Sequence, residues 1–313
     1  MGQAGAGTQG AETVSKFHTS DMQRMWDEQI KQVVFEDYQP SDNPLTVFLG
    51  GQSGAGKTQG VHTIMGAYRD EGLVYINPDD YRQFHPDYDK LMEERPLDMP
   101  KRTARASAVW TDLAVETADN ERYSTIVEGT WNNVDRVLQQ MQEAKDCGRR
   151  VHAAALATPP TLSRLAVLER YYRDLSMGRP ARWVSPDFHD KIVESLPDKI
   201  SMVADSGIPD RFIVVDRKDG LIPYSADESE DFLNEWNERF QRPLSVEEAE
   251  MVYEHAERIR ENISDIDPDN EEAKRAVLSL YDEPTIFRIH PIGMPEVDSR
   301  QPRKPNGEYD FKN

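Results

Sequence analysis

The sequence predicts an α/β fold, in which a parallel sheet is flanked by helices and is followed by a helical C-terminal extension. Three observations carry this prediction. A glycine-rich motif directly follows an apolar run, short apolar runs alternate with helical segments, and the strand signal vanishes after about residue 225. A length of 313 residues accommodates one large domain with appendages, or two smaller domains.

The apolar run at residues 45–50 leads into the sequence GGQSGAGKT, which fits the pattern G-x-x-x-x-G-K-[ST] at every fixed position. Glycines let such a loop curl until several backbone N–H groups point at one anion. Lys57 is expected to reach the β- and γ-phosphates of a nucleoside triphosphate, and Thr58 to place its hydroxyl on Mg²⁺. The fold class is therefore a sheet of the P-loop NTPase type. The expected nucleotide contacts are Gly51, Gln52, Ser53, Gly54, Ala55, Gly56, Lys57 and Thr58.

Strand and helix signals alternate along most of the chain. Further strands are expected at residues 73–76, 124–127, 150–157 and 211–215. Helices are expected at residues 17–37, 59–68, 101–118, 134–145, 162–175 and 186–204. Strands that are joined by single helices imply crossover connections and a parallel sheet. In such a sheet, a phosphate-binding loop after the first strand places the site at the carboxyl ends of the strands.

The segments outside this alternation set the expected domain boundaries. Residues 1–16 begin with a run rich in Gly, Ala and Gln and are expected to be disordered. The nucleotide-binding domain then covers residues 17–225, in which the amphipathic stretch 22–33 is expected to pack on the core. A helical extension covers residues 226–294, with helices at 228–241 and 245–283, and an irregular tail covers residues 295–313.

The composition argues against several classes of function. Asp and Glu number 57 against 37 Lys and Arg, giving a formal net charge of -20, which disfavours binding to nucleic acid and to anionic membranes. No run of about 18 apolar residues is present, so no membrane span is expected. The single cysteine, Cys147, cannot form an internal disulfide and fits a reducing cytoplasm.

Acidic residues follow two of the expected strands. Asp79 and Asp80 come directly after the second strand, where a carboxylate can accept a proton from a substrate hydroxyl or can cap the next helix. Glu128 follows the third strand, with Thr130 two residues later. This glutamate can hold Mg²⁺ through water, or it can lie in a solvated turn. The pattern alone leaves both pairs of alternatives open.

A basic cluster lies on and after the helix that follows the fourth strand. Guanidinium groups at this place can neutralise charge on a transferring phosphoryl group or clamp substrate phosphates. They can also lie on a helix surface, paired with Glu169 and Asp174. The cluster consists of Arg164, Arg170, Arg173, Arg179 and Arg182.

Taken in order, these clusters resemble the zeta toxin family of kinases, the toxin halves of bacterial toxin–antitoxin pairs. The similarity covers about residues 20–220 and rests on the segments GGQSGAGKT, PDDYRQFHPDYDKL, VEGTWNNVD, AAALATPP, LERYY and ARWVSPDFHD. The resemblance implies an enzyme that uses ATP and Mg²⁺ to phosphorylate the 3′-hydroxyl of the amino-sugar in UDP-N-acetylglucosamine. It also implies a small helical antitoxin protein as a partner.

The resemblance assigns roles to the residues after the strands. By this comparison Asp79 matches the catalytic base of the family. Lys57 and Thr58 match the phosphate-loop pair, and Glu128 and Thr130 match contacts to substrate or metal. Glu128 therefore joins Thr58 as an expected metal contact.

The resemblance also extends to the expected acceptor side, with two departures. Arg170 and Arg182 match arginines that contact phosphates, the second with a slip of one residue beside Trp183. Asp112 falls where family members carry a glutamate that binds the sugar, and Asn132 falls where many carry an arginine. Loss of that fork-shaped cation leaves the acceptor open, with a different nucleotide-sugar or NAD as competitors. The alternative from another class is a nucleotide-switch NTPase that binds a protein partner.

Overall fold

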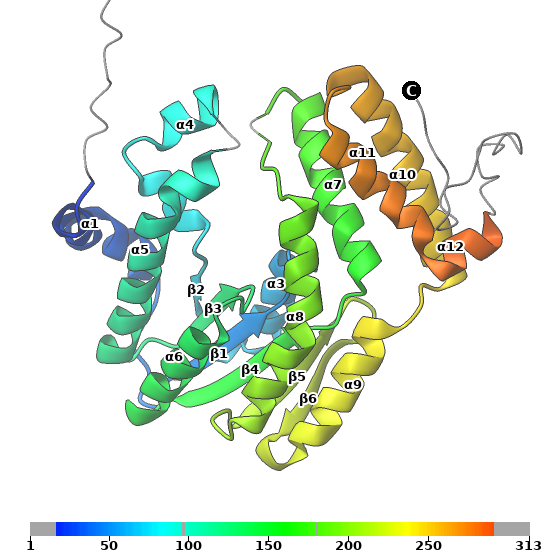
Figure 1. Ribbon diagram of the computed structural model, residues 1–313. Coiled ribbons are helices and arrows are strands. Elements are labelled where there is room, and N and C mark those ends of the chain that lie inside the picture. The colour runs from blue at the N-terminus through cyan, green and yellow to red at the C-terminus, as the bar shows by residue number, and fades with distance from the viewer. Residues whose placement is uncertain (1–16, 96–97, 180, 291–313) are drawn as a thin grey trace, which may run out of the picture.

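The protein is described by a computed structural model, which covers residues 17–95, 98–179 and 181–290 (Figure 1). In this part of the chain, six strands form one sheet in the order β2-β3-β1-β4-β5-β6. Strands β1 to β5 run parallel, and β6 is antiparallel to β5. The strands are β1 (Leu45–Gly50), β2 (Val74–Ile76), β3 (Thr125–Gly129), β4 (Arg150–Leu156), β5 (Arg211–Asp216) and β6 (Gly220–Ser225). The predicted fold class is confirmed.

Strand β6 is the element that the sequence analysis missed. It forms a hairpin with β5, in which Pro223 lies opposite Ile213 and Gly220 has a positive φ of 74°. Proline lacks the backbone N–H that a central strand needs, so its presence argues against a strand. An edge strand tolerates proline, and β6 is the last strand of the sheet. The Asp219-Gly220 pair was the available turn signal.

Helices cover both faces of the sheet. One face packs against α5 (Met99–Glu121), α6 (Val134–Asp146), α8 (Pro186–Asp205) and α9 (Ser229–Gln241), and this side contains the largest buried apolar cluster. The opposite face packs against α3 (Lys57–Ala67), whose Val61 and Ile64 are buried beside β1, β4 and β5. Because both faces are covered, the central strands are apolar almost throughout.

The N-terminal helical segment packs on the core, as predicted. It consists of α1 (Thr19–Met25), a π-helical turn η1 (Trp26–Ile30) and α2 (Lys31–Phe35). Met22, Trp26 and Ile30 are all buried within the main cluster. Trp110 of α5 donates a hydrogen bond from Nε1 to the carbonyl oxygen of Met22 at 3.0 Å. Val33, on the outer side, is exposed.

The C-terminal helices form a second core with α7 (Pro160–Ser176). These helices are α10 (Val246–Ile266), α11 (Glu271–Leu278) and α12 (Pro284–Ile289), which we call the C-terminal unit, and they lie on the outer side of α7 in Figure 1. The helix predicted at 245–283 is interrupted after Ile266, where Pro268 follows. The predictions for residues 1–16 and 295–313 lie outside the described residues.

Short helical turns complete the described chain. They are η2 (Arg69–Glu71), η3 (Asp80–Phe84), α4 (Tyr88–Glu94), η4 (Ala226–Glu228) and η5 (Ser279–Asp282). Of these, η3 follows β2 and carries the residues next to Asp79, and η5 follows α11.

Candidate functional site

The loop between β1 and α3 has the backbone of a phosphate-binding loop. Gly54 and Gly56 have positive φ values of 78° and 96°, and α3 begins directly afterwards at Lys57. The Lys57 ammonium donates to the carbonyl oxygens of Gly51 and Gln52, each at 3.0 Å. Burial lowers the pKa of Lys57, while nearby Glu128 opposes this shift. The loop thus encloses its own lysine at the N-terminus of a helix.

Residues at the start of α7 and just before it hold this loop in place through hydrogen bonds. Gln52 is fully buried and donates from Nε2 to the Thr158 carbonyl oxygen at 2.8 Å and to Ser163 Oγ at 3.2 Å. Thr158 in turn donates its hydroxyl to the Ala55 carbonyl oxygen at 2.7 Å. A Cβ on Gly54 would lie 2.0 Å from the Ser163 carbonyl oxygen, so this position requires glycine. The loop is therefore held in place before any ligand binds.

A cavity of about 470 Å³ opens above the loop and brings most of the predicted site residues together. Lys57 and Thr58 line it from the loop, and Asp79 lines it from the end of β2. Glu128 and Thr130 reach it from the end of β3. The carboxyl ends of parallel strands meet at one edge of a sheet, which explains this convergence. We call this space the donor cavity.

Asp79 is held by two arginines. Its Oδ1 accepts from Arg82 Nε at 2.9 Å, and its Oδ2 forms an ion pair with Arg182 Nη1. Burial would raise the pKa of Asp79, but Arg182 and then Arg82 hold it below its usual value. Both carboxylate oxygens face these arginines, so Asp79 makes no side-chain hydrogen bond that would cap η3, although it stands at the N-cap position of that turn. The neighbouring Asp80 is exposed.

Glu128 lies between the lysine of the loop and a tyrosine. Tyr75 donates its hydroxyl to Glu128 Oε2, and burial raises the pKa of Glu128, opposed mainly by the charge of Lys57. Among the described residues, no group of three His, Cys, Asp or Glu side chains is placed to hold a metal ion. Mg²⁺ takes one or two protein oxygens and keeps several waters, so Thr58 and Glu128 on one cavity wall fit its needs.

Arginines form the rest of the donor cavity. Arg170 and Arg173 of α7 line it together with Arg182. The Nε atoms of Arg170 and Arg182 are buried and have no hydrogen-bond partner among the described residues. Burial first, and then the charge of Arg182, lower the pKa of Arg170. Buried cationic donors that lack partners suit an anionic ligand.

Two further arginines line the donor cavity without having been assigned a role from the sequence. Arg217 donates from Nη2 to the Gly54 carbonyl oxygen at 3.0 Å, and Arg82 pairs with Asp79. Arg217 directly follows β5, and this position at a strand end was the signal that could have indicated it. Of the other predicted cations, Arg164 pairs with Asp190 away from the cavity, and Arg179 is exposed.

A second cavity, of about 520 Å³, adjoins the first. Both are lined by Pro78, Arg82, Glu128, Gly129 and Thr130, so these residues form a common wall. We call the second space the acceptor cavity, after the role that we propose for it below.

The acceptor cavity contains Asp112, whose Oδ1 accepts from Arg136 Nη2 at 2.9 Å and from Gln140 Nε2 at 3.2 Å. Trp131 forms another part of the wall, with a positive φ of 52°. Its indole lies over Gly50, where a Cβ would approach to 2.4 Å. Backbone strain of this kind at a cavity wall is typical of functional sites.

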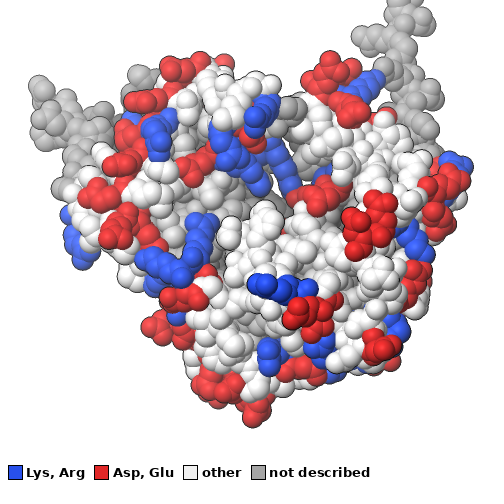
Figure 2. Space-filling model, turned by 180° about the vertical axis from the view of Figure 1, so that it is seen from behind, with Lys and Arg blue, Asp and Glu red and all other residues white. Residues whose placement is uncertain are grey.

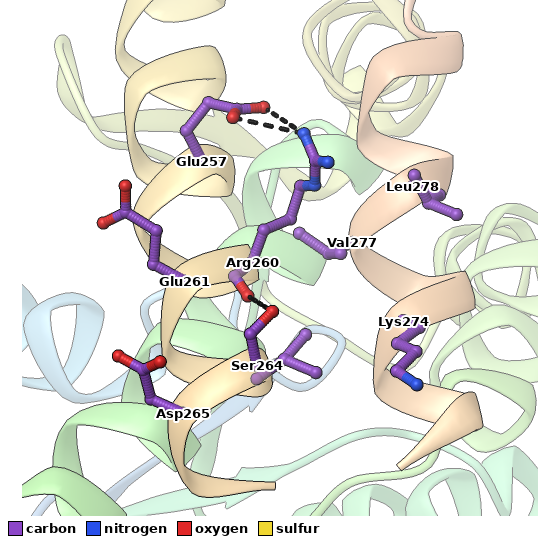
Figure 3. A pocket seen from close by; sticks show the side chains of 9 residues that line it. Glu257, Arg260, Glu261, Ser264, Asp265, Lys274, Val277 and Leu278 are labelled. Carbon is purple, nitrogen blue, oxygen red and sulfur yellow. Dashed lines mark hydrogen bonds and ion pairs between the residues drawn. The ribbon is translucent and has the colours of Figure 1, made fainter. Parts of the chain in front are cut away.

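A cavity of similar size lies elsewhere, between α10 and α11 (Figure 3). It measures about 560 Å³, and the carboxylates of Glu257, Glu261 and Asp265 along α10 line it. Arg260 and Lys274 also line it, but they are paired with Glu257 and Glu271, and the lining includes neither the glycine-rich loop nor a strand end, so size alone does not identify the site. Acidic and basic side chains are interspersed over the face seen in Figure 2, whereas cations gather in the donor cavity.

The fold and the site together define a nucleotide-binding protein of the P-loop class. The family model described as Zeta toxin matches residues 28–229. The chain therefore belongs to the zeta toxin family, and the resemblance drawn from its motifs is confirmed. Among the described residues, no helix has the length and apolar character to cross a membrane.

Several relatives support this assignment. "Toxin PezT" of Streptococcus pneumoniae is 31% identical over 221 residues, covering 67% of this chain and 87% of that protein. "Toxin zeta" of Streptococcus pyogenes is 26% identical over 170 residues, covering 53% of this chain and 58% of that protein. A solved structure from work on the PezAT chromosomal toxin–antitoxin system of S. pneumoniae has a TM-score of 0.66 and 27% identity. That match covers 79% of this chain and 98% of the other.

Proposed function

We propose that the protein is an ATP-dependent kinase that phosphorylates the 3′-hydroxyl of the amino-sugar of UDP-N-acetylglucosamine. The observation that carries this proposal is the common wall of the two cavities, which contains Glu128 and Thr130 and lies beside Asp79. A kinase must hold a donor and an acceptor in adjacent spaces that meet at the transferred group. A protein that binds nucleotide alone does not need the second space.

The donor cavity supplies charge neutralisation. Lys57, Arg170 and Arg182 surround the space above the loop, where they would balance negative charge on the β- and γ-phosphates. When bound, ATP would supply the phosphoryl group and Mg²⁺ would supply further positive charge beside its phosphates. Thr58 and Glu128 are the residues that would hold the ion, Glu128 through water.

Asp79 is the proposed base. In the unliganded geometry its charge is balanced by Arg182 and Arg82. A phosphate in the donor cavity competes for Arg182, because a guanidinium pairs with phosphate as readily as with carboxylate. Partial release from Arg182 raises the pKa of Asp79 toward its ordinary value. Asp79 would then accept the proton of the acceptor hydroxyl, while the hydroxyl oxygen bonds to the γ-phosphorus and the bond from that phosphorus to the bridging oxygen breaks, releasing ADP.

Asn132 stands where many members of the family carry an arginine, and another cation of the acceptor cavity can take the place of that arginine. Arg136, in the first turn of α6 and four residues further along the chain, lines the same space as Asn132. Lys199 of α8 donates to Asn132 Oδ1 at 3.3 Å, which brings a second positive charge to this rim. Asp112, paired with Arg136, is expected to accept hydrogen bonds from sugar hydroxyls. These groups support an acceptor that has both phosphates and hydroxyls.

The direct test is a product assay. The protein is incubated with ATP, Mg²⁺ and single acceptors from a panel of nucleotide-sugars and NAD, and the products are identified by mass. We expect phosphorylated UDP-N-acetylglucosamine and ADP formation that depends on the acceptor. Release of phosphate without any acceptor would instead indicate a switch NTPase. Phosphorylation of NAD alone would move the assignment to a different acceptor.

The role of Asp79 is tested in the same assay with a matched control. Asp79→Asn should lower transfer by about 10²-fold or more while ATP binding persists, because the base is lost and the phosphate contacts remain. Asp80→Asn removes the adjacent, exposed carboxylate and should leave transfer near the wild-type rate. Equal effects of the two substitutions would contradict the assignment of Asp79.

A small helical antitoxin protein is the proposed partner. The support is the likeness to a structure from a toxin–antitoxin system. If the kinase activity is toxic, expression of the wild-type chain alone should arrest bacterial growth, whereas expression of Asp79→Asn should not. Growth arrest by both forms would separate toxicity from phosphoryl transfer.

A further inference from the structure

We propose that a chain of hydrogen bonds couples the C-terminal unit to the phosphate-binding loop and positions that loop for nucleotide. We call this chain the relay. It rests on nucleotide binding by the loop, which is part of the proposed function, but not on the identity of the acceptor. The relay consists of Ser279, Arg164, Asp190, His189, Ser163 and Gln52.

The outer half of the relay joins the C-terminal unit to α7 and α8. Arg164 of α7 donates from Nη1 to Ser279 Oγ at 2.8 Å, and Ser279 is the residue directly after α11. The Nη2 of the same guanidinium donates to Asp190 Oδ1 on α8. His189 Nδ1 lies 3.0 Å from that carboxylate oxygen. One arginine therefore ties three separate segments together.

The inner half reaches the loop. His189 Nε2 lies 2.9 Å from Ser163 Oγ, and that hydroxyl accepts from Gln52 Nε2 at 3.2 Å. Gln52 belongs to the loop itself, and its carbonyl oxygen accepts from the Lys57 ammonium at 3.0 Å. The inner end of the relay is thus bonded to the lysine of the phosphate site.

Because the inner residues of the relay are buried, they depend on one another for their hydrogen bonds. Gln52 and Ser163 have no exposed surface, and His189 is 2% exposed, so water cannot replace a lost partner at these three residues. Burial lowers the pKa of His189, although its hydrogen bond with Asp190 opposes the shift. A neutral ring that donates from Nδ1 to Asp190 has Nε2 as an acceptor, and this Nε2 and the Pro160 carbonyl oxygen, each 2.9 Å from Ser163 Oγ, then share the single hydroxyl proton of Ser163.

The order Ser163, His189 and Asp190 also matches the residue types of a hydrolytic triad. That role requires a serine hydroxyl that a substrate carbonyl can reach. Ser163 is completely buried, and its hydroxyl already faces Gln52, His189 and the carbonyl oxygen of Pro160. The triad geometry therefore serves to position the loop, not to attack a substrate.

A second contact ties the C-terminal unit to the donor cavity. Trp183 donates from Nε1 to Glu272 Oε2 of α11 at 3.1 Å, and Trp183 directly follows Arg182. The ring of Trp183 also packs edge-to-face against Tyr171 of α7. The C-terminal unit thus contacts both the loop support and the segment that carries a phosphate-binding arginine.

The experiment is a double-mutant cycle on ATP affinity, measured by calorimetry with Mg²⁺ and without acceptor. We expect Ser279→Ala to weaken ATP binding by about threefold to tenfold, and Ser163→Ala to weaken it at least as much. Because both substitutions break one chain, the double variant should lose less than the product of the two effects. Hydrogen exchange of residues 51–58 should accelerate in Ser279→Ala, which would show loosening of the loop without reference to ATP.

The matched control is Ser264→Ala. Ser264 lies in the same C-terminal unit, and its hydroxyl donates to the Arg260 carbonyl oxygen of its own helix at 3.1 Å. This variant should bind ATP like the wild type. Multiplicative effects in the cycle, or equal effects of Ser279→Ala and Ser264→Ala, would overturn the relay while wild-type ATP binding stands. A wild-type protein that binds ATP but transfers no phosphoryl group would instead overturn the kinase proposal alone.

Discussion

His152 of β4 is a buried residue whose ionisation affects folding. Its Nδ1 lies 3.0 Å from the Tyr68 hydroxyl, and the side chain is 6% exposed. Burial, followed by the charges of Arg211 and Arg150, lowers the pKa of His152 from 6.5 to about 4. The folded protein therefore keeps this ring neutral at pH values where an unfolded chain would protonate it.

This shift predicts a specific acid sensitivity. As the pH falls below 6.5, His152 becomes protonated in the unfolded state, whereas in the folded state it stays neutral until about pH 4. The free energy of unfolding therefore falls across this range. The loss amounts to roughly 2 kcal/mol at pH 5 relative to pH 7.5. His152→Asn should remove this part of the loss, whereas His62→Asn, on the exposed side of α3, should not. Urea unfolding at both pH values measures the difference, and equal losses in all three proteins would refute it.

The sequence located acidic and loop residues better than it located cations. Lys57, Asp79 and Glu128 lie together in the donor cavity because each lies at or after the carboxyl end of a parallel strand, which is a topological rule readable from sequence. The position of Arg136 beside Asp112 depends on how α6 packs against α5, and sequence spacing does not contain that information. A long flexible side chain such as that of arginine can reach several partners, so the tertiary structure determines which carboxylate it pairs with.

At the scale of elements, α7 depends on the C-terminal unit. Its Leu165, Leu168 and Tyr172 are buried in one cluster with Val252, Ile259 and other residues of that unit. Removing α10, α11 and α12 would expose this apolar face, and burial of each such side chain contributes about 1.5–3 kcal/mol.

A truncation tests this dependence. A chain that ends at residue 243 should melt at least about 5 °C lower than the full chain, equivalent to roughly 2 kcal/mol, or should lose cooperativity. It should also bind a dye that reports exposed apolar surface. A chain that ends at residue 290 keeps all three helices and serves as the control. Indistinguishable melting of the two truncated chains would show that α7 is stable without the unit.

Element prediction succeeded where one periodicity dominated. The helices at 134–145 and 162–175 were expected within two residues of their observed bounds, because apolar residues recur there at helical spacing. The sequence did not predict strand β6, because a strand that contains proline is tolerated only at the edge of a sheet, and which strand lies at the edge is a property of the assembled fold. The π-helical turn η1 also gave no signal in the sequence.

At the scale of the whole molecule, charge is unevenly distributed. The formal net charge is -20, yet Lys57, Arg170, Arg173, Arg182 and Arg217 lie around one cavity. Like charges repel one another over the acidic surface and also among the cations of this cavity, which Asp79 and Glu128 balance only in part. The unliganded fold therefore works against two sets of repulsions of opposite sign.

This distribution predicts that salt stabilises the unliganded protein. Raising NaCl from about 0.02 M to about 0.2 M shortens the Debye length to less than about 10 Å and screens both repulsions. We expect the melting temperature to rise by roughly 2 °C or more, corresponding to about 1 kcal/mol. The rise should level off above this range, which distinguishes screening from a general effect of salt on water. A melting temperature that stays constant or falls as NaCl is added would contradict the prediction.

The two edges of the sheet bear on how the chain avoids aggregation. An exposed strand edge is a template on which another chain can add a strand. Here one edge is β2, which is only three residues long, and the other is β6, which is interrupted by Pro223. A short edge and an edge that lacks a backbone donor both resist such addition. The proline that concealed β6 in the sequence thus helps to keep the folded sheet from growing.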